Sequence, residues 1–468
     1  MMPFKPILLW TDALIWLLVA SVAFYAWRVR RHEHLLAPWR KVARRRTGMI
    51  SAIVLAVFAA VGLADSLHFR LSLPDAGNGA ARQYAPEVLS LFDMMANPLR
   101  TRVEKSYSAP FASQLYVKET VELPGGGQVR QHPRLKYGGA HLSDPGERAG
   151  DIAATAAKGV FHGVVLWWGC TLLLTLALAR RRHLSAGAAW RMIRQGRDEI
   201  PWRTILATLG AILIAASAAA ALSANYHILG TDKVGQDVFY LSLKSIRTGL
   251  VIGTVTTLVM LPFALALGIA AGYFRGWVDD VIQYVYTTLN SIPGVLLIAA
   301  AVLILQVYMD GNPDSFDTVN ARADLRLLFL CLILGMTSWT GLCRLLRGEA
   351  LKLREADFIQ AATAFGVGHL RIILRHILPN VMHIVLITVV LDFSGLVLAE
   401  AVLSYVGVGV DPTTQSWGNM INAARLEMAR EPMVWWSLAA AFAFMFLLVL
   451  AANLFADSVR DAFDPRLK

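Results

Sequence analysis

The few side chains of this sequence that could carry chemistry lie in or beside long apolar segments. His369, His376 and His383 recur every seven residues, but Pro379 stands between them and is expected to interrupt any single helix, so we expect no metal site there. Neither a Gly-x4-Gly-Lys-Ser/Thr phosphate loop nor a Gly-x-Ser-x-Gly or His-Glu-x-x-His motif occurs in the 468 residues. The sequence therefore predicts no catalytic residue, no metal site and no cofactor in this chain.

Two acidic residues stand inside one of the apolar segments. Asp392 and Glu400 are eight residues apart, a spacing that places both near one face of a helix. A carboxylate inside a membrane is costly and usually faces the interior of a bundle or a water-filled path. Two interpretations follow. Either these acids line or gate a transport path, or they make structural polar contacts or reach an interface.

Long helices are needed to position these residues, and the composition predicts such helices. Hydrophobic residues make up 56% of the chain and charged residues 16%, whereas soluble domains carry about 25% charge. An apolar helix of about 20 residues spans the hydrocarbon core of a bilayer and satisfies its own backbone. We therefore predict an all-α polytopic membrane protein with nine spans, at 7–27, 49–64, 160–179, 205–222, 248–273, 281–307, 327–346, 381–403 and 435–455. Three cysteines in or beside these spans lack paired spacing and are expected to be small core residues: Cys170, Cys331 and Cys343.

Basic residues between the spans predict the orientation of the chain. The connectors 28–46, 180–203 and 344–375 are rich in Lys and Arg, whereas 310–324 holds four Asp and one Arg. Under the positive-inside rule we predict a multi-pass membrane protein with its N-terminus outside and its C-terminus in the cytoplasm. The net charge of +11 is explained by these connectors, so we expect no nucleic-acid partner. Ser21-Val22-Ala23 could end a cleaved signal peptide, but the basic cluster that follows favours a retained span.

Residues 65–158 form the longest polar insertion, and the predicted orientation places them outside. Residues 86–97 indicate a short amphipathic helix with Pro86 in its first turn. Apolar and polar residues alternate over 115–123 and an extended run resumes after Pro124-Gly125-Gly126-Gly127, which predicts a β-hairpin. The insertion is therefore expected to be a small α+β module, and it either caps the helices or docks a soluble partner.

The segment 357–379 predicts two short helices at the inner face of the membrane. The first helix carries small and aromatic residues on one side: Phe358, Ala361, Ala362 and Phe365. Gly366 can supply a tight turn. The second helix places Arg371 and Arg375 on one face, and Pro379 begins the next span. This hairpin either fits another protein or is an amphipathic element that lies in the interface.

The segment resembles the EAA motif of ATP-binding-cassette (ABC) importer permeases, whose consensus is Glu-Ala-Ala-x3-Gly-x9-Ile-x-Leu-Pro. The matching positions are Ala361, Ala362, Gly366, Leu378 and Pro379, with the spacing from glycine to proline intact. Gln360 stands at the family's glutamate position and His376 at its isoleucine position. The run 375–380 resembles the version in dipeptide and oligopeptide permeases. The resemblance implies a coupling helix that seats in a cleft of an ATPase subunit, and Gln360 puts in doubt any ion pair at its position.

Further stretches are similar to the C-type subunits of peptide permeases and follow in the family order. Residues 227–238 resemble the signature before the second core helix and carry Gly230, Thr231, Asp232, Gly235 and Asp237. Residues 272–279 resemble the next loop of these subunits. Residues 399–410 and 416–420 resemble the last external region of these subunits, and 416–420 carries Trp417 and Gly418. Residues 461–466 resemble the C-terminal end of these subunits.

The resemblance also implies a division of the chain. Residues 205–468 would form the six-helix core of a type I importer permease, with the coupling loop at 357–379. Residues 1–64 would add two transmembrane helices with a basic cytoplasmic loop, and 65–158 the periplasmic insertion. Residues 159–204 would add a third helix and a basic linker. The family offers no template for these first 204 residues.

The resemblance implies a role and a set of partners. This chain would be a non-catalytic permease subunit that forms half of a translocation pathway for peptides delivered by a periplasmic binding protein. A second permease subunit would complete the pathway, and two ATPase subunits would bind ATP and Mg²⁺ and drive alternating access. The alternatives are import of nickel, a metallophore or another small solute, or a membrane scaffold or sensor that does not transport.

Overall fold

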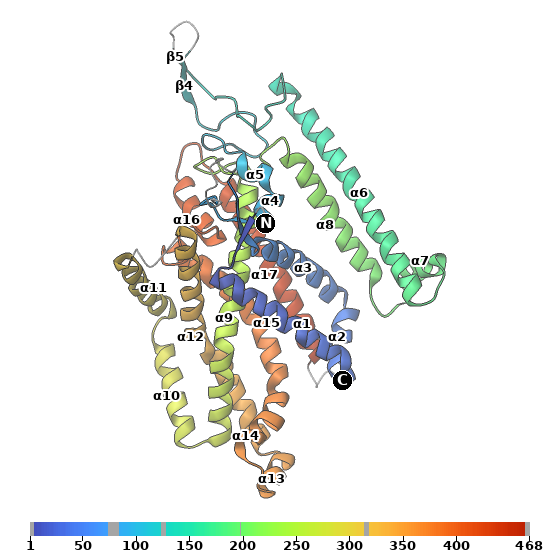
Figure 1. The fold of residues 1–468 in the computed structure, drawn as a ribbon, viewed down its shortest axis with the longest axis vertical. Coiled ribbons are helices and arrows are strands. Elements are labelled where there is room, and N and C mark those ends of the chain that lie inside the picture. Colours follow the sequence, from blue (N-terminus) through green and yellow to red (C-terminus); the bar gives the residue numbers. More distant parts are fainter. Residues whose placement is uncertain (1–3, 74–83, 123–127, 197, 313–317, 464–468) are drawn as a thin grey trace, which may run out of the picture. The chain divides into compact units, whose positions relative to one another are not determined.

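The computed structural model describes residues 4–73, 84–122, 128–196, 198–312 and 318–463. Within these residues nine helices are long and apolar enough to cross a membrane, which confirms the predicted all-α polytopic fold (Figure 1). They are α1 (Trp10–Arg31), α3 (Arg46–Asp65), α6 (Arg148–Arg181), α8 (Trp202–Ser223), α9 (Val238–Phe274), α11 (Gly294–Gly311), α12 (Val319–Arg354), the helix His369–Tyr405 and α17 (Trp436–Phe463). Shorter helices include α2 (Glu33–Arg44), α7 (Ala186–Gln195), α13 (Asp357–Ala364) and α16 (Trp417–Glu427).

The chain folds into two compact units that interleave along the sequence. Most of the first unit is formed by Leu36–Arg247 and Gln415–Ser458, and most of the second by Ile7–Leu35 and Thr248–Thr414. The N-terminal extension is therefore shared between the two units and does not form a domain of its own.

In the first unit, α6 and α8 pack side by side through glycines (Figure 1). A β-carbon on Gly163 would come within 2.6 Å of Ile214 Cα. Gly210 leaves space for the indole of Trp167, whose Nε1 donates a hydrogen bond to a carbonyl of α8 at 2.8 Å. The spacing Gly159-x3-Gly163 is the small-residue pattern that lets membrane helices approach closely. The last span of the extension, α6, is thus fixed to α8, the first helix of the family-like core.

The polar insertion of the first unit contains short strands and helices. β2 (His68–Leu71) pairs antiparallel with β3 (Leu89–Ser90), in a sheet of order β1-β2-β3 that includes β1 (Phe4–Ile7). β4 (Glu119–Glu122) and β5 (Gln128–Gln131) pair antiparallel and confirm the predicted hairpin. Its expected turn, Pro124 to Gly127, lies outside the described residues.

The helix predicted for residues 86–97 begins later than expected. Leu89 and Ser90 are extended because they pair with β2, so α4 runs over Leu91–Met95 and α5 over Asn97–Thr101. Ser90 caps α4 through a reciprocal pair of 3.0 Å hydrogen bonds with Asp93. The prediction that Pro86 lies in the first turn was therefore wrong, because sheet pairing outweighs the local amphipathic pattern.

In the second unit, one apolar core joins α9, α12 and the helix His369–Tyr405. Its buried members include Met260, Trp339, Leu346, Ile372 and Val381. Glycines of α9 meet α12 directly, since a β-carbon on Gly268 would lie 2.8 Å from a backbone oxygen of that helix. Cys331 and Cys343 are buried free thiols, as predicted, whereas Cys170 is half-buried.

α1, the first span of the extension, also belongs to the second unit. Its Thr11 is fully buried, and both the amide and the hydroxyl of that residue donate to the Asp324 carboxylate on α12. A polar contact of this kind fixes one helix against another where water is excluded. The extension therefore contacts the family-like part of the chain in both units.

Proline positions account for two differences between prediction and structure, and the first is in the sixth span. The single span predicted over 281–307 is wrong: α10 (Trp277–Ser291) ends before α11 begins at Gly294. Pro293 has no amide hydrogen, and Ile292 before it is extended with ψ of 129°. α11 alone meets the length and composition of a spanning helix in this region.

The second difference is at Pro379, which does not interrupt the helix that contains it. α14 (His369–Ile372) continues through a π-helical turn, Ile373–Ile377, into α15 (Leu378–Tyr405). The wider π turn immediately before the proline is the local adjustment that such a helix can make around a residue without an amide hydrogen. The expectation of an interruption there was therefore wrong, and His369–Tyr405 forms one helix of 37 residues.

Candidate functional site

The segment 357–379 consists of two helices joined by a left-handed glycine. Gly366 has φ of +75°, a conformation that is costly for a residue with a β-carbon. The amide of Val367 donates to Ala362 O at 3.0 Å and closes the end of α13. Gly368 precedes α14 in extended conformation. The expected tight turn at Gly366 is thus present.

The two helices direct some apolar side chains into the bundle and others to solvent. Ile359 is 1% exposed and Ile372 fully buried, whereas Phe365 is 87% exposed and Leu370 70% exposed. Among the residues predicted to couple, Ala362 is half-buried, and the others lie exposed: Phe358, Gln360, Ala361, Phe365, Gly366, Arg371, Arg375 and Pro379. Contiguous exposed apolar residues rimmed by basic ones are characteristic of protein contact surfaces.

Polar contacts hold this segment against the end of α9. Tyr273 Oη lies 2.9 Å from His369 Nδ1, and Arg275 Nη2 lies 2.5 Å from Glu355 Oε1. Gln360 Nε2 donates to Glu355 O at 3.1 Å. The side-chain amide at the family's glutamate position is therefore engaged within the chain.

A bidentate ion pair fixes the start of α10 nearby. Arg347 of α12 donates from Nε to Asp279 Oδ1 at 2.6 Å and from Nη2 to Oδ2 at 2.7 Å, the geometry of a strong arginine–carboxylate pair. A groove of about 570 Å³ opens beside the segment, lined by Tyr273, Phe274, Arg354, Glu355, Ile359, Gln360, Thr363, Ala364 and His369. The exposed helices and this groove form a surface supported by rigid elements.

The structure gives the two membrane acids different surroundings. Glu400 is 2% exposed, and its Oε1 accepts a hydrogen bond from Ser404 Oγ at 2.7 Å. Asp392 is half-buried and makes no hydrogen bond or ion pair with any residue that the structure describes. It lies about 20 Å from either end of α15 at 1.5 Å per residue, which is near the middle of a spanning helix.

Backbone of the insertion approaches the glycines of 227–238 closely. Gly235 has φ of +78°, and a β-carbon there would lie 1.9 Å from Glu104 O. Gly230 has φ of +71°, and its β-carbon would lie 2.3 Å from Ser108 O. Both positions therefore require glycine for conformation and for space.

Most of the remaining motif residues of the first unit are buried and fixed by hydrogen bonds, whereas Asp232 is half-buried. Thr231 Oγ1 accepts from Ser108 N at 2.7 Å, and Thr231 O accepts from Trp436 Nε1 at 3.0 Å. Trp417 is 1% exposed and donates from Nε1 to a carbonyl of α9 at 3.1 Å, and Gly418 beside it is buried. Asp232 Oδ1 accepts two amides of its own turn, at 3.0 and 2.8 Å. These contacts hold the motif in shape.

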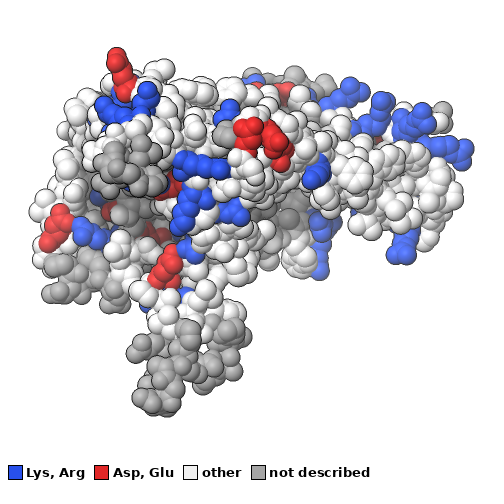
Figure 2. Space-filling view, turned by 90° about the horizontal axis from the view of Figure 1, so that it is seen from above, with Lys and Arg blue, Asp and Glu red and all other residues white. Residues whose placement is uncertain are grey.

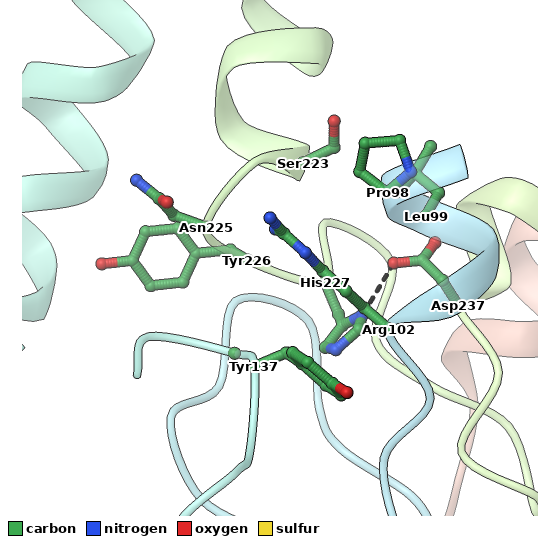
Figure 3. A pocket seen from close by; sticks show the side chains of 10 residues that line it. Pro98, Leu99, Arg102, Tyr137, Ser223, Asn225, Tyr226, His227 and Asp237 are labelled. Atoms are coloured by element: carbon green, nitrogen blue, oxygen red, sulfur yellow. Dashed lines mark hydrogen bonds and ion pairs between the residues drawn. The ribbon is translucent and has the colours of Figure 1, made fainter. Parts of the chain in front are cut away.

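His227 lies buried between two carboxylates. Its Nδ1 is 2.7 Å from Asp237 Oδ2, drawn as a dashed line in Figure 3, and its Nε2 is 3.4 Å from Glu104 Oε1. Burial acts to lower the pKa of His227, but the two carboxylates outweigh it and raise the pKa to about 9. Burial acts to raise the pKa of Glu104, but hydrogen bonds from His227 and from the amides of 136–138 lower it to about 2.

A second buried cluster joins the extension to α9. Lys244 pairs with Asp93, and its Nζ lies 3.2 Å from Asp65 Oδ1. Tyr240 Oη donates to Asp93 Oδ1 at 2.6 Å. Burial acts to raise the pKa of Asp93, but the lysine charge and these hydrogen bonds lower it. Sequence reasoning missed this cluster, although a lone lysine in a long apolar helix signals that a carboxylate partner is near.

Comparison with known protein families matches residues 264–468 to the family described as "Binding-protein-dependent transport system inner membrane component". The oligopeptide transport system permease protein OppC of Mycobacterium tuberculosis is 31% identical over 239 residues, which cover 51% of this chain and 76% of that protein. The glutathione transport system permease protein GsiD of Pectobacterium atrosepticum is 33% identical over 52% of this chain and 73% of that protein. The dipeptide transport system permease protein DppC of Alkalihalophilus pseudofirmus is 32% identical, with the same coverage.

These relatives match about half of the chain. The residues that the family model matches, 264–468, hold the exposed segment 357–379 and its supports. Members of this family generally work with an ATPase and with a binding protein. With nine apolar helices among the described residues, the chain belongs to the family of binding-protein-dependent inner membrane components and is a transmembrane permease subunit of an ABC importer.

Proposed function

We propose that this chain forms half of a translocation pathway for peptides in the bacterial inner membrane. A second permease subunit supplies the other half, two ATPase subunits hydrolyse ATP, and a periplasmic binding protein delivers the cargo. The observation that carries the proposal is the exposed segment 357–379, fixed at its base by Tyr273–His369 and Arg275–Glu355. The names of the relatives, which refer to oligopeptide, dipeptide and glutathione transport, support a peptide cargo.

The exposed segment is the contact with the ATPase in this proposal. Phe365 and Leu370 remain uncovered within the chain, and the groove beside them mixes the charges of Arg354 and Glu355 with aromatic rings. Such a surface suits insertion of protein side chains. The absence of a phosphate loop from the sequence supports ATP hydrolysis in the partner subunits.

Asp392 lines the pathway in this proposal, and Glu400 has a structural role. An unpartnered carboxylate near the middle of a membrane helix is stable where it meets water or a cation. Asp392 has no partner among the residues that the structure describes. Glu400, which accepts from Ser404, is already engaged.

The insertion 65–158 acts as a cap on the external end of the permease core, at 205–468. Support comes from the contacts of Glu104, Ser108, Asp65 and Asp93 with residues that follow α8. Docking of a further soluble partner is not needed to explain these contacts. The rest of the extension adds three spans. Two of them, with a basic loop, lie in 1–64, and the third, with a basic linker, lies in 159–204. In this arrangement the N-terminus is outside and the C-terminus is in the cytoplasm.

Transport by the reconstituted complex tests the proposal. The chain, its partner permease and the ATPase subunits are placed in vesicles with the binding protein and ATP, and entry of a labelled peptide is measured beside entry of radioactive nickel. We expect peptide uptake that requires ATP and is lost in the Asp392→Ala variant. ATP-driven uptake of nickel without peptide would overturn the cargo assignment, and uptake of neither by an assembled, ATP-hydrolysing complex would overturn the role in transport.

A further inference from the structure

Two short helices of the first unit are confined to the ends of membrane spans. α2 lies between α1 and α3, separated from each by a single residue. α7 lies between α6 and α8. An amphipathic helix tied to spanning helices on both sides cannot leave the membrane–water interface. The two connectors reach the same interface, because Arg44 Nη2 lies 2.5 Å from Glu199 Oε2.

α7 is held rigidly with its basic side outward. Ser185 Oγ caps its start by accepting from Ala188 N at 3.3 Å, and Gly196 ends it with φ of +63°. Ile193 is 2% exposed and packs against Leu178 of α6 and Leu206 of α8. The opposite side of the helix therefore faces away from the bundle.

Cations on these connectors outnumber the acids available to neutralise them. The exposed basic residues that make no ion pair with any residue that the structure describes include six on these connectors: Lys41, Arg46, Arg181, Arg191, Arg194 and Arg203. The nearby acids are already engaged, because Asp198 binds Arg182 and Trp202 at 2.8 and 2.7 Å and Glu199 binds Arg44. Figure 2 shows blue side chains gathered at the right, the side on which Figure 1 draws α7.

We propose that these six residues, the basic connector surface, bind the phosphate headgroups of anionic phospholipids. Arginine side chains match phosphate oxygens in charge and in bidentate geometry. Trp190, 38% exposed on α7, places an aromatic ring at the depth where such rings settle in the interface. A lipid headgroup is the occupant already present at this level, whereas a soluble partner would have to displace the bilayer surface. The proposal does not depend on the cargo of the importer.

Lipid binding by the purified full-length chain in a neutral detergent tests this proposal. The probe is fluorescent phosphatidylglycerol, with fluorescent phosphatidylcholine as the uncharged comparison and inorganic phosphate as a soluble competitor. The test variant combines Lys41→Gln, Arg46→Gln, Arg191→Gln and Arg194→Gln. The matched control removes four exposed cations of the insertion and its border, by Lys118→Gln, Arg130→Gln, Lys136→Gln and Lys158→Gln.

We expect the test variant to lose about two to three orders of magnitude in affinity for phosphatidylglycerol, since each of its four basic residues near an anionic surface contributes about fivefold. Phosphatidylcholine binding should not change, and inorganic phosphate should not displace the lipid probe. A control variant that loses as much as the test variant would overturn the proposal. Unchanged phosphatidylglycerol binding in a test variant that unfolds at the wild-type temperature would also overturn the proposal. So would displacement of the lipid probe from the wild-type chain by inorganic phosphate.

Discussion

The carbonyl oxygen of Glu104 lies so close to Gly235 that a β-carbon on residue 235 would be only 1.9 Å from it. Glu104 belongs to the insertion and Gly235 to the motif before α9, so this contact is one of those that join the extension to the permease core. Gly235 also has φ of +78°. We therefore expect Gly235→Ala to release the insertion, at a cost of about 2 kcal/mol or more from strain and overlap together.

Limited proteolysis of residues 104–139 measures this release, because a detached segment is cut faster. Gly276→Ala is the control: Gly276 also has positive φ, but a β-carbon there meets nothing within 4 Å, and it lies in the second unit. Equal cleavage of the two variants at 104–139 would contradict the close-contact explanation.

The buried His227 predicts a pH dependence of the same junction. Its pKa of about 9 lies above the ordinary value of 6.5, so its contribution to stability is complete below pH 6.5 and is lost as the pH rises through 9. Glu104, with its pKa lowered from 4.5 to about 2, contributes fully above pH 4.5 and loses its contribution as the pH falls toward 2. We expect the melting temperature of the purified chain to fall between pH 7 and pH 9.5.

The His227→Gln variant identifies the source of that change. Glutamine cannot titrate, so the variant should melt at a lower temperature near neutral pH and show a flatter curve on the alkaline side. An alkaline decline as steep in the variant as in the wild type would assign the effect to other groups.

The packing of α6 on α8 predicts a sharp difference between two glycines of one helix. A leucine at Gly163 would overlap Ile214, whereas Gly169 faces open space. Overpacking a tight contact costs about 1–3 kcal/mol, so Gly163→Leu should separate the helices and Gly169→Leu should not. The melting temperature of the purified chain measures the lost packing. Equal melting temperatures for the Gly163→Leu and Gly169→Leu variants would show that this interface tolerates the larger residue.

Replacing the exposed Phe365 is expected to weaken binding of the ATPase without affecting the folding of the chain. Because its ring is 87% exposed, Phe365→Glu should leave the melting temperature unchanged while it reduces co-purification of the ATPase by about tenfold or more, as for a contact residue at the centre of an interface. Met95→Glu is the comparison, since Met95 is 72% exposed on α4, outside the spans and outside the segment 357–379. Normal co-purification of the Phe365→Glu variant would remove this surface from the proposed contact.

The spans and the segment 357–379 could be predicted from the sequence because their signals are local. Runs of apolar residues define membrane helices wherever they pack, and the spacing from Gly366 to Pro379 is contained in one stretch of chain. The same local reasoning failed at two prolines. It overlooked Pro293, which breaks the sixth span, and it assumed a break at Pro379, where a π-helical turn keeps the helix continuous.

Long-range pairing was the part that the sequence could not supply. Nothing near Lys244 indicates that its partners are Asp65 and Asp93, more than 150 residues earlier for both. Likewise, Glu104 and His227 are 123 residues apart in the sequence, and only the folded chain brings them into contact. The sequence suggested an insertion that caps or docks, and the contacts of these side chains are what favour the cap.

The unbroken helix His369–Tyr405 has a mechanical consequence. At 1.5 Å per residue its 37 residues form a rod about 55 Å long, with α13 attached at one end and Glu400 near the other. A tilt of about 5° at the α13 end would displace the far end by about 5 Å over that length. Pro379, which was expected to separate these regions, thus lies within one continuous helix, and in the proposed function a tilt caused at α13 by the ATPase subunit is transmitted directly to the region of Glu400.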